Sequence, residues 1–329
     1  MRALVMALAV AGLAAAGIVH AVGAPRARLG PYPGLGRCGF PQPSLGPGAP
    51  AAADESAWNQ DVSAAPLDPN SDAYIAYIDS HGGDLLHPDF GSPHAYGFPY
   101  AVVGRRARRT RVHFTAYGDE SDRGRYRVPP HAPVEGGQRS DGDRHVLTVD
   151  RARCRLYELY RAFFVRRPRP HWNADSGVIW NLRSSRLRPD GFTSADAAGL
   201  PIFPGLVRYD EARRGAISHA IRVTFDSTQN AWIHPASHCA GDTANPDAPP
   251  MGLRLRLRAG FDTSGITGAA HAVAVALKRY GLIVADNGSN WFISGTSDHR
   301  WPDRDLDQLK AIPGSAFEVV RSAAPIHRC

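Results

Sequence analysis

Alternation of apolar and polar side chains is the main pattern in this chain, and it predicts β-strands. The clearest case is LRLRLRAGF (253–261), where three leucines alternate with three arginines. Because successive side chains of a strand point to opposite faces, the leucines are expected to face the core and the arginines the solvent. The segments RVHFTAY (111–117) and ISHAIRVTF (217–225) alternate in the same way and predict two further half-buried strands.

Short apolar runs between turns predict the other strands, at 100–103, 145–150, 155–164, 176–182 and 317–320. The two apolar arms of LIVADNGSNWFISG flank an Asn-Gly pair, which predicts a β-hairpin. One amphipathic helix is expected near 263–280, with Gly281 as its stop. Together these elements predict a mainly β fold, a jelly-roll-like β-sandwich of two sheets with one helix packed on a face.

The composition agrees with many short strands, since 33 glycines and 27 prolines occur in 329 residues. Residues 1–21 combine a basic start, a long apolar run and small residues before a predicted cut after Ala21, the pattern of a secretory signal peptide. An uncleaved anchor is the alternative, because the apolar run is only slightly shorter than a membrane span. A linker rich in Pro, Gly and Ala (22–53) and a single β-rich domain (54–329) are expected to follow.

Export would place the four cysteines where disulfides persist, and four cysteines allow three pairings. We expect Cys38–Cys154 and Cys239–Cys329. A zinc site of four cysteines is disfavoured, because none of them lie in close CxxC pairs. No cofactor is expected either, because the chain has no P-loop and no dinucleotide-binding fingerprint.

The formal net charge is +7, and the arginines gather in RRARR (105–109) and RRPRPH (166–171). Such clusters can bind an acidic polymer, but they are also typical of an ordinary solvated surface. Neither lies within a nucleic-acid-binding motif, so no nucleic acid partner is predicted. The expected partner is an extracellular polysaccharide or cell-surface glycan, and no stable membrane insertion is expected after the signal is cleaved.

Several long motifs carry a resemblance to known sequences. At WNQDVS, GLPIFPGLVRYDE and ADNGSNWFISG, the chain resembles a group of secreted bacterial proteins of unassigned activity. The likeness covers Trp58 to Val320. It implies export and a single domain, and it carries over no catalytic residue.

Carboxylates and histidines near apolar segments are the candidate catalytic residues. Enzymes that cleave polysaccharides need one protonated and one ionised carboxyl group a few ångströms apart. Glu158 lies between apolar neighbours and Asp196 lies in the near-apolar TSADAAGLPIF, although Asp196 also fits the start of a helix. Two histidines, His219 on an apolar strand face and His238 in HPASHC, complete the predicted pocket, and Asp196 is expected within reach of His219.

Two alternatives remain open. If HPASHC is helical, His234 and His238 lie on one side and form a metal site with Asp242. Tryptophans beside loops can stack on sugar rings, and the candidates for substrate binding are Trp172, Trp232 and Trp301. The sequence therefore predicts a secreted carbohydrate-active enzyme, a polysaccharide hydrolase or lyase. The alternative is a non-catalytic extracellular β-sandwich that binds glycan or cell wall.

Overall fold

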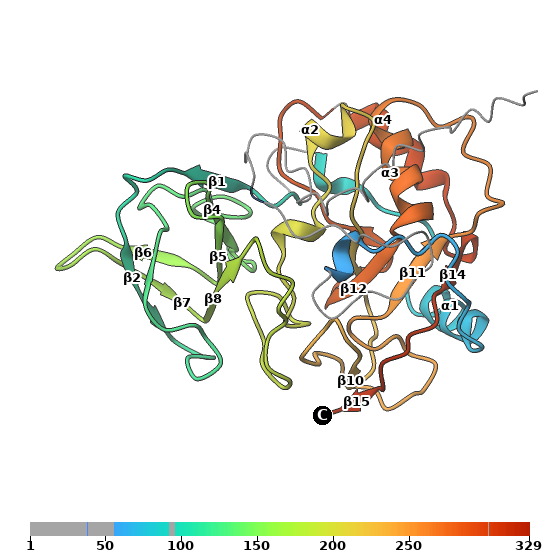
Figure 1. The fold of residues 1–329 in the computed structure, drawn as a ribbon, viewed down its shortest axis with the longest axis horizontal. Coiled ribbons are helices and arrows are strands. Elements are labelled where there is room, and N and C mark those ends of the chain that lie inside the picture. The colour runs from blue at the N-terminus through green and yellow to red at the C-terminus, as the bar shows by residue number, and fades with distance from the viewer. Residues whose placement is uncertain (1–37, 39–55, 92–95, 302) are drawn as a thin grey trace, which may run out of the picture.

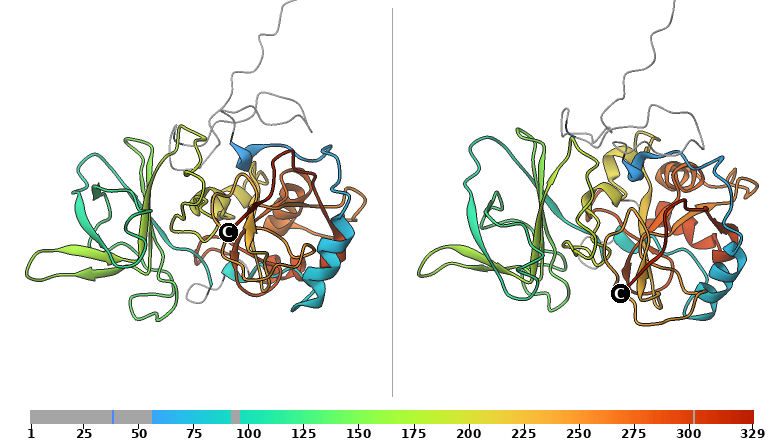
Figure 2. Two further views of the ribbon diagram at one scale, coloured as in Figure 1. Left: turned by 90° about the horizontal axis from the view of Figure 1, so that it is seen from below. Right: turned by 60° about the horizontal axis from the view of Figure 1, so that its bottom comes forward.

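The computed structural model describes residues 38, 56–91, 96–301 and 303–329, which form two lobes side by side (Figure 1). The views in Figure 2 show the same division. The predicted signal peptide (1–21) and all of the linker except Cys38 lie outside the described residues. Among the residues that are described, no helix has the length and hydropathy to cross a bilayer.

The small lobe contains two four-stranded sheets. The first has the order β1 (Tyr100–Val103), β4 (Val146–Asp150), β5 (Arg155–Tyr160), β8 (Ser176–Asn181). The second has the order β3 (Arg125–Tyr126), β2 (Thr110–Phe114), β7 (His171–Ala174), β6 (Phe163–Val165). One buried cluster, which includes Val146 and Trp172, contains side chains from both sheets and joins them. A second cluster covers the other face of the first sheet, so every residue of β4 is buried.

The large lobe is built on a five-stranded sheet. Its order is β13 (Phe292–Ile293), β9 (Ile221–Phe225), β12 (Leu282–Asn287), β11 (Arg254–Leu257), β14 (Phe317–Val319). Helix α3 (Gly268–Arg279) contacts β11 and α1 (Ser71–Ser80) contacts β14. The short elements are α2 (Tyr209–Ala212), α4 (Asp303–Leu306), the pair β10 (Ala231–Trp232) and β15 (His327–Arg328), and the 3₁₀ turns η1 (Ala57–Asn59), η2 (Asp89–Gly91), η3 (Phe203–Gly205), η4 (Asp307–Ala311) and η5 (Gly314–Ala316).

The predicted mainly β character is confirmed, but the described strands do not form the two antiparallel sheets of a jelly roll. They form four sheets, and three strand pairs are parallel: β1–β4, β2–β7 and β9–β12. Parallel neighbours need long crossover connections, which alternation within one strand does not encode. Each short strand was predicted from its own pattern, whereas the partner of each strand is set by packing between distant segments.

The Asn-Gly hairpin is wrong for the same reason. Strands β12 and β13 flank this turn in sequence, but β9 lies between them, parallel to β12 and antiparallel to β13. Three side chains of β9, Ile221, Val223 and Phe225, are fully buried. Burial of this central strand therefore outweighs the local preference of the turn.

The predicted helix near 263–280 is confirmed, although it begins later, at Gly268. Its first turn is capped by a side chain from elsewhere, because the Ala269 N–H donates to Asp305 Oδ2 at 2.7 Å. Asp262, by contrast, accepts a bond from the Ser264 N–H in a separate turn. The cap comes from a residue 36 positions away in the chain. The local pattern does not show this cap, so the predicted start of the helix is too early.

Both predicted disulfides are present, Cys38–Cys154 and Cys239–Cys329. The second ties β15 to the segment that follows β10, and the first ties Cys38 to the small lobe. Disulfides of this kind fit an oxidising compartment.

Residues 193–207, which we call the connecting segment, run between the lobes. Gly205 packs so closely on Trp58 that a Cβ at this position would lie 2.5 Å from the indole ring. The side chains Ile202, Phe203 and Leu206 join the cluster on the small-lobe sheet. Hydrophobic contacts to both lobes therefore hold this segment in place.

The leucines of LRLRLR are buried as expected, but the arginines are not simply exposed. Arg256 is only 9 % exposed, donates to Glu318 Oε1 at 2.7 Å and also bonds the carbonyls of Val62 and Ala65. Arg256 therefore holds residues 62–65 against the sheet. Arg258 is much more exposed and lies at 3.4 Å from both Asp72 and Glu318.

We expect Arg256→Met to lower the free energy of unfolding by about 3–5 kcal/mol, because it leaves the buried Glu318 without its closest partner. The matched change Arg258→Met should cost less than about 1 kcal/mol, since exposed ion pairs contribute little. Chemical denaturation of both variants measures the difference. Equal losses of unfolding free energy in the two variants would contradict this role of Arg256.

Candidate functional site

A cavity of about 310 Å³ lies where the two lobes meet. The small lobe and the large lobe each contribute loop and strand residues to its wall, and the connecting segment supplies the rest. The lining residues are Tyr117, Asp143, His145, Tyr160, Ser176, Thr193, Ser194, Ala195, Asp196, Ala197, His238, Cys239, Ala240 and Asp286. Most of these side chains are polar, so the cavity suits a polar ligand.

Two carboxylates of this cavity share one buried arginine. Arg222 on β9 is 2 % exposed, and its Nη2 donates to Asp196 Oδ1 and lies 3.5 Å from Asp286 Oδ2. Asp196 Oδ1 and Asp286 Oδ2 therefore both lie within 3.5 Å of Nη2. The distance between these two carboxylate oxygens is at most twice 3.5 Å. The second guanidinium nitrogen, Nη1, donates to Ser294 Oγ at 2.8 Å. A buried charge needs such partners, because its desolvation is otherwise very costly.

A β-bulge brings Asp286 to this arginine. The pairing of β12 with β9 runs Val284 to Val223 and then Asp286 to Thr224, so Ala285 is an extra residue. Without the bulge, Asp286 would pair with Phe225, whose side chain is in the hydrophobic core. Since a shift of one residue reverses the face of a side chain, the bulge moves Asp286 from the core face to the face that carries Arg222.

Burial raises the pKa of both carboxyl groups. For Asp196, desolvation outweighs the stabilising charge of Arg222. For Asp286, desolvation and the negative charge of Asp196 both raise the pKa. The side chain of Asp286 remains 25 % exposed, whereas Asp196 is 1 % exposed and its Oδ2 has no hydrogen-bond partner among the described residues. Asp286 is therefore the member of the pair that a ligand can reach.

His145 contributes a buried positive charge to the wall. Its Nδ1 lies 2.5 Å from Glu135 Oε2 and its Nε2 lies 2.9 Å from the carbonyl oxygen of Ala195. Both partners can only accept, so both ring nitrogens must donate and the ring is an imidazolium. Burial opposes this charge, but the Glu135 carboxylate prevails and raises the pKa of His145 to about 9.

His238 faces the same cavity with a fixed ring. Its Nδ1 donates to the carbonyl oxygen of Ala197 at 3.0 Å. A histidine that donates from Nδ1 to a backbone carbonyl has its lone pair on Nε2 in the neutral form. The ring is therefore arranged to accept a proton at Nε2.

The structure brings two predicted catalytic residues, Asp196 and His238, into the cavity, but Glu158 lies outside it. Glu158 is fully buried and accepts hydrogen bonds from the Trp180 indole and from the backbone N–H groups of Ile202 and Phe203. Burial raises the pKa of Glu158 to about 7, although the three hydrogen-bond donors lower it. Its observed contacts attach the connecting segment to the small-lobe sheet.

His219 is buried, as predicted, at 2 % exposure, but it does not line the cavity. Its Nδ1 donates to the Ala220 carbonyl oxygen at 2.7 Å and its Nε2 lies 3.2 Å from Glu211 Oε2. Asp196 is bonded to Arg222, whereas the ring nitrogens of His219 contact the Ala220 carbonyl oxygen and Glu211. The expected link between His219 and Asp196 stays a prediction. The apolar pattern around His219 correctly placed it in the interior, but not beside the cavity.

None of the predicted tryptophan platforms is available to a sugar. Trp172, Trp232 and Trp301 are at most 6 % exposed, and all six tryptophans of the chain are buried. Trp172 belongs to the cluster between the small-lobe sheets, and the other two belong to the core of the large lobe. Proximity to a loop therefore did not imply exposure.

The predicted metal ligands His234, His238 and Asp242 are not brought together. HPASHC forms a turn followed by irregular backbone, and its two histidines have different surroundings: His238 lines the cavity and His234 contacts Asp190. The ligand group found within the described residues is instead Asp190, His234 and His327. The four-residue spacing aligns two histidines only on a helix, and this segment is not a helix.

Only weak sequence patterns mark the other site residues. Arg222 stands as a single charge inside an apolar strand, and Asp286 ends an apolar run directly before Asn-Gly. The first pattern indicates a buried ion pair, but it does not identify the partner. The second pattern is typical of a turn, and a β-bulge has no clear local pattern that would distinguish it.

Comparison with protein-family models, with curated proteins and with solved structures finds no match. The resemblance to a group of secreted bacterial proteins therefore stays a prediction, and the function is inferred from the geometry of the site.

The raised pKa values predict a pH dependence of stability. Glu158 has a folded pKa of about 7, so its stabilising effect is complete below its unfolded pKa and disappears as the pH rises through 7. The raised pKa values of Asp196, Asp286 and His145 act in the same direction. The melting temperature should therefore fall by several degrees between pH 5 and pH 8.

The variant Glu158→Gln should flatten this dependence, because an amide cannot ionise. Calorimetric scans across the pH range measure both slopes. A wild-type melting temperature that rises towards pH 8 would contradict the assignment.

Proposed function

We propose that this protein is an exported carbohydrate-active enzyme that cleaves glycosidic bonds, with Asp286 as general acid and His238 as general base. The observation that carries the proposal is the reachable carboxyl of Asp286, whose pKa is raised by burial and by Asp196. A general acid must keep its proton near neutral pH, and these two causes favour the protonated form.

Asp196 has a positioning role in this scheme. It is almost completely buried and bonds Arg222, the residue that also attracts Asp286. Its negative charge disfavours a second charge on Asp286, as in other pairs of carboxyl groups that share one site. Asp196 therefore acts on the substrate through Asp286.

His238 supplies the base. Its Nδ1–H is held by the Ala197 carbonyl oxygen, so Nε2 can take a proton from a water molecule or from a sugar carbon. In a hydrolase, Asp286 protonates the leaving oxygen while water, deprotonated by His238, attacks the anomeric carbon. In a lyase, His238 removes the proton next to a uronate carboxyl group and Asp286 protonates the leaving oxygen.

The cavity supports a sugar as the substrate class. Its volume, about 310 Å³, falls at the small end of the range for ligand pockets. Its wall offers the polar side chains of Tyr117, Asp143 and Tyr160 as well as the catalytic pair. Hydroxyl and carboxylate groups of this kind match the many hydroxyls of a sugar.

Export follows from the predicted signal peptide, and the two disulfides agree with it because they indicate an oxidising compartment. An extracellular or periplasmic location would bring the enzyme to a polysaccharide or cell-surface glycan.

Asp286→Asn should reduce turnover by about 10²–10⁴-fold, because the amide cannot donate the proton. Incubation with a panel of polysaccharides, followed by assays for new reducing ends and for unsaturated products, measures the effect and separates hydrolase from lyase. His238→Gln should cause a comparable loss. The controls Asp72→Asn and His271→Gln change exposed residues of α1 and α3 and should retain full activity. Normal turnover in both site variants would refute the proposal.

The pH profile tests the role of Asp196. In the wild type, activity should fall as the pH rises through the raised pKa of Asp286. Asp196→Asn removes the neighbouring negative charge, so the alkaline limb should move to lower pH. An unchanged limb in this variant would show that Asp196 has only a structural role.

A second candidate function is glycan binding without catalysis, through arginines of the small lobe. The side chains of Arg105, Arg106, Arg108 and Arg109 in one loop and of Arg166, Arg167 and Arg169 in another are all exposed. Arginine suits the carboxylates and sulfates of acidic polysaccharides. The buried tryptophans, by contrast, disfavour a binding surface made of aromatic rings.

Binding to an acidic polysaccharide should then weaken steeply with added salt, because exposed charges are screened. Replacing Arg105, Arg106, Arg108 and Arg109 by Ser should reduce binding severalfold in a pull-down at low salt, while Asp286→Asn should bind as the wild type does. Binding that is insensitive to both salt and these arginines would exclude this mode.

A further inference from the structure

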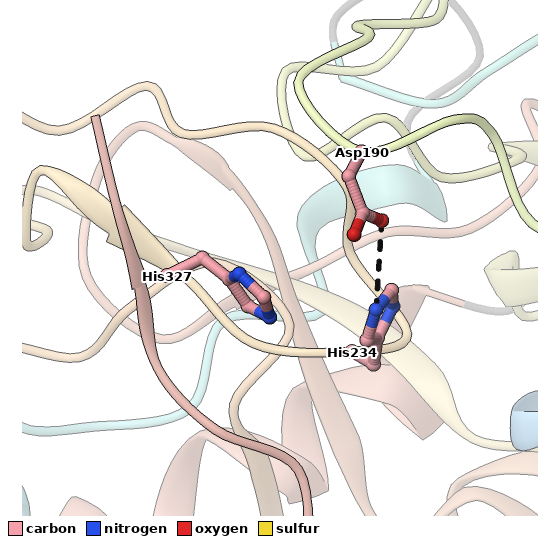
Figure 3. Close-up of side chains that lie close together, drawn as sticks. All are labelled: Asp190, His234 and His327. Atoms are coloured by element: carbon pink, nitrogen blue, oxygen red, sulfur yellow. Dashed lines mark ion pairs between the residues drawn. The ribbon is translucent and has the colours of Figure 1, made fainter.

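The side chains of Asp190, His234 and His327 lie close together (Figure 3), and none of them is among the residues that line the cavity. They come from three segments that are distant in sequence: the loop that leads to the connecting segment, the turn after β10, and β15. We propose that these three side chains bind Zn²⁺. The proposal does not depend on the proposed enzymatic activity.

The distances suit a metal better than a hydrogen bond. One ligand atom from each residue lies within 4.8 Å of the others, and His234 Nε2 is 3.5 Å from Asp190 Oδ1. A hydrogen bond to nitrogen is shorter, at about 2.7–3.2 Å. Two ligands of a tetrahedral zinc ion with bonds of about 2.0–2.1 Å lie about 3.3 Å apart. The His234–Asp190 edge already has nearly this length.

The two imidazole rings are held in position by an indole. His327 stacks on Trp232 with ring centroids 4.0 Å apart and an interplanar angle of 5°. His234 meets the same indole edge-on, at 5.1 Å and 77°. Trp232 is buried, so it is a rigid support. Ligands whose orientation is fixed in advance lose little entropy on binding a metal.

Backbone contacts also hold His327 and Asp190 in position. β15 pairs with β10 so that His327 lies opposite Trp232, and the Cys239–Cys329 disulfide holds the chain two residues beyond His327. Asp190 is held from the other side, because the Gly191 N–H donates to the Ser237 carbonyl oxygen at 2.7 Å. The Asp190 side chain is 57 % exposed, so it can adjust its position to complete the site.

The donor set selects the type of metal. Two imidazoles and one carboxylate favour Zn²⁺ over Ca²⁺ and Mg²⁺, which prefer oxygen ligands. Three protein ligands leave the fourth tetrahedral position to water, and the partial exposure of all three side chains permits this. The metal would join β15 to two segments that continue into the cavity wall, at Thr193 and at His238.

The test is a Zn²⁺ titration of the oxidised full chain, first dialysed against a chelator and then assayed in competition with a chromophoric zinc indicator. The wild type should bind one Zn²⁺ per chain, and its melting temperature should rise when Zn²⁺ is added. Asp190→Ala and His234→Gln should each raise the Kd by at least about tenfold and abolish the shift in melting temperature. Ca²⁺ and Mg²⁺ should not displace Zn²⁺.

His271→Gln is the matched control, because it removes an exposed histidine on α3 and should leave the Kd unchanged. Asp190→Ala changes an exposed turn residue, so loss of binding in this variant is not explained by unfolding. The proposal is overturned if the wild type takes up no Zn²⁺, or if either site variant binds Zn²⁺ as tightly as the wild type.

Discussion

The need to neutralise one buried guanidinium organises the centre of this molecule. Arg222 points away from the hydrophobic core of its own sheet and is almost fully buried at the junction of the lobes. An unpaired charge at such a place would cost several kcal/mol. The structure meets this cost with Asp196 from the connecting segment and Asp286 from β12. Two acidic side chains distant in sequence are therefore brought together at the edge of a cavity.

The single charge of Arg222 does not fully stabilise two ionised carboxylates that are largely removed from water. Desolvation penalises each negative charge, and each carboxylate also penalises the other. The pair therefore retains a proton at a higher pH than isolated carboxyl groups do. Neutralisation of Arg222 and the raised pKa values of the two carboxyl groups, on which the proposed acid catalysis depends, therefore have the same physical origin.

Local patterns in the sequence predicted the elements well and their partners poorly. Strands such as 100–103, 145–150 and 176–182 and the helix ending near Arg279 are encoded by periodicity over a few residues. The parallel pairing of β9 with β12, the β-bulge at Ala285 and the cap from Asp305 depend on distant segments. The structure places Asp196 and His238 in the wall of one cavity, whereas Asp286 and His145 could not be assigned without the pairing of the strands.

The connecting segment explains why these distant contributions converge. From the small lobe, His145 donates to the Ala195 carbonyl oxygen and Glu158 accepts from Ile202 and Phe203. From the large lobe, Arg222 binds Asp196 and the Ala198 N–H donates to the Ala285 carbonyl oxygen.

The last of these bonds falls on the extra residue of the bulge, so the shift that turns Asp286 towards Arg222 also fixes the backbone beside Asp196. Each lobe satisfies polar groups of the same short segment, so both lobes hold the part of the cavity wall that this segment forms. A site of this kind depends on the register of a strand in one lobe and on a buried carboxylate in the other, which explains why its residues are scattered along the sequence.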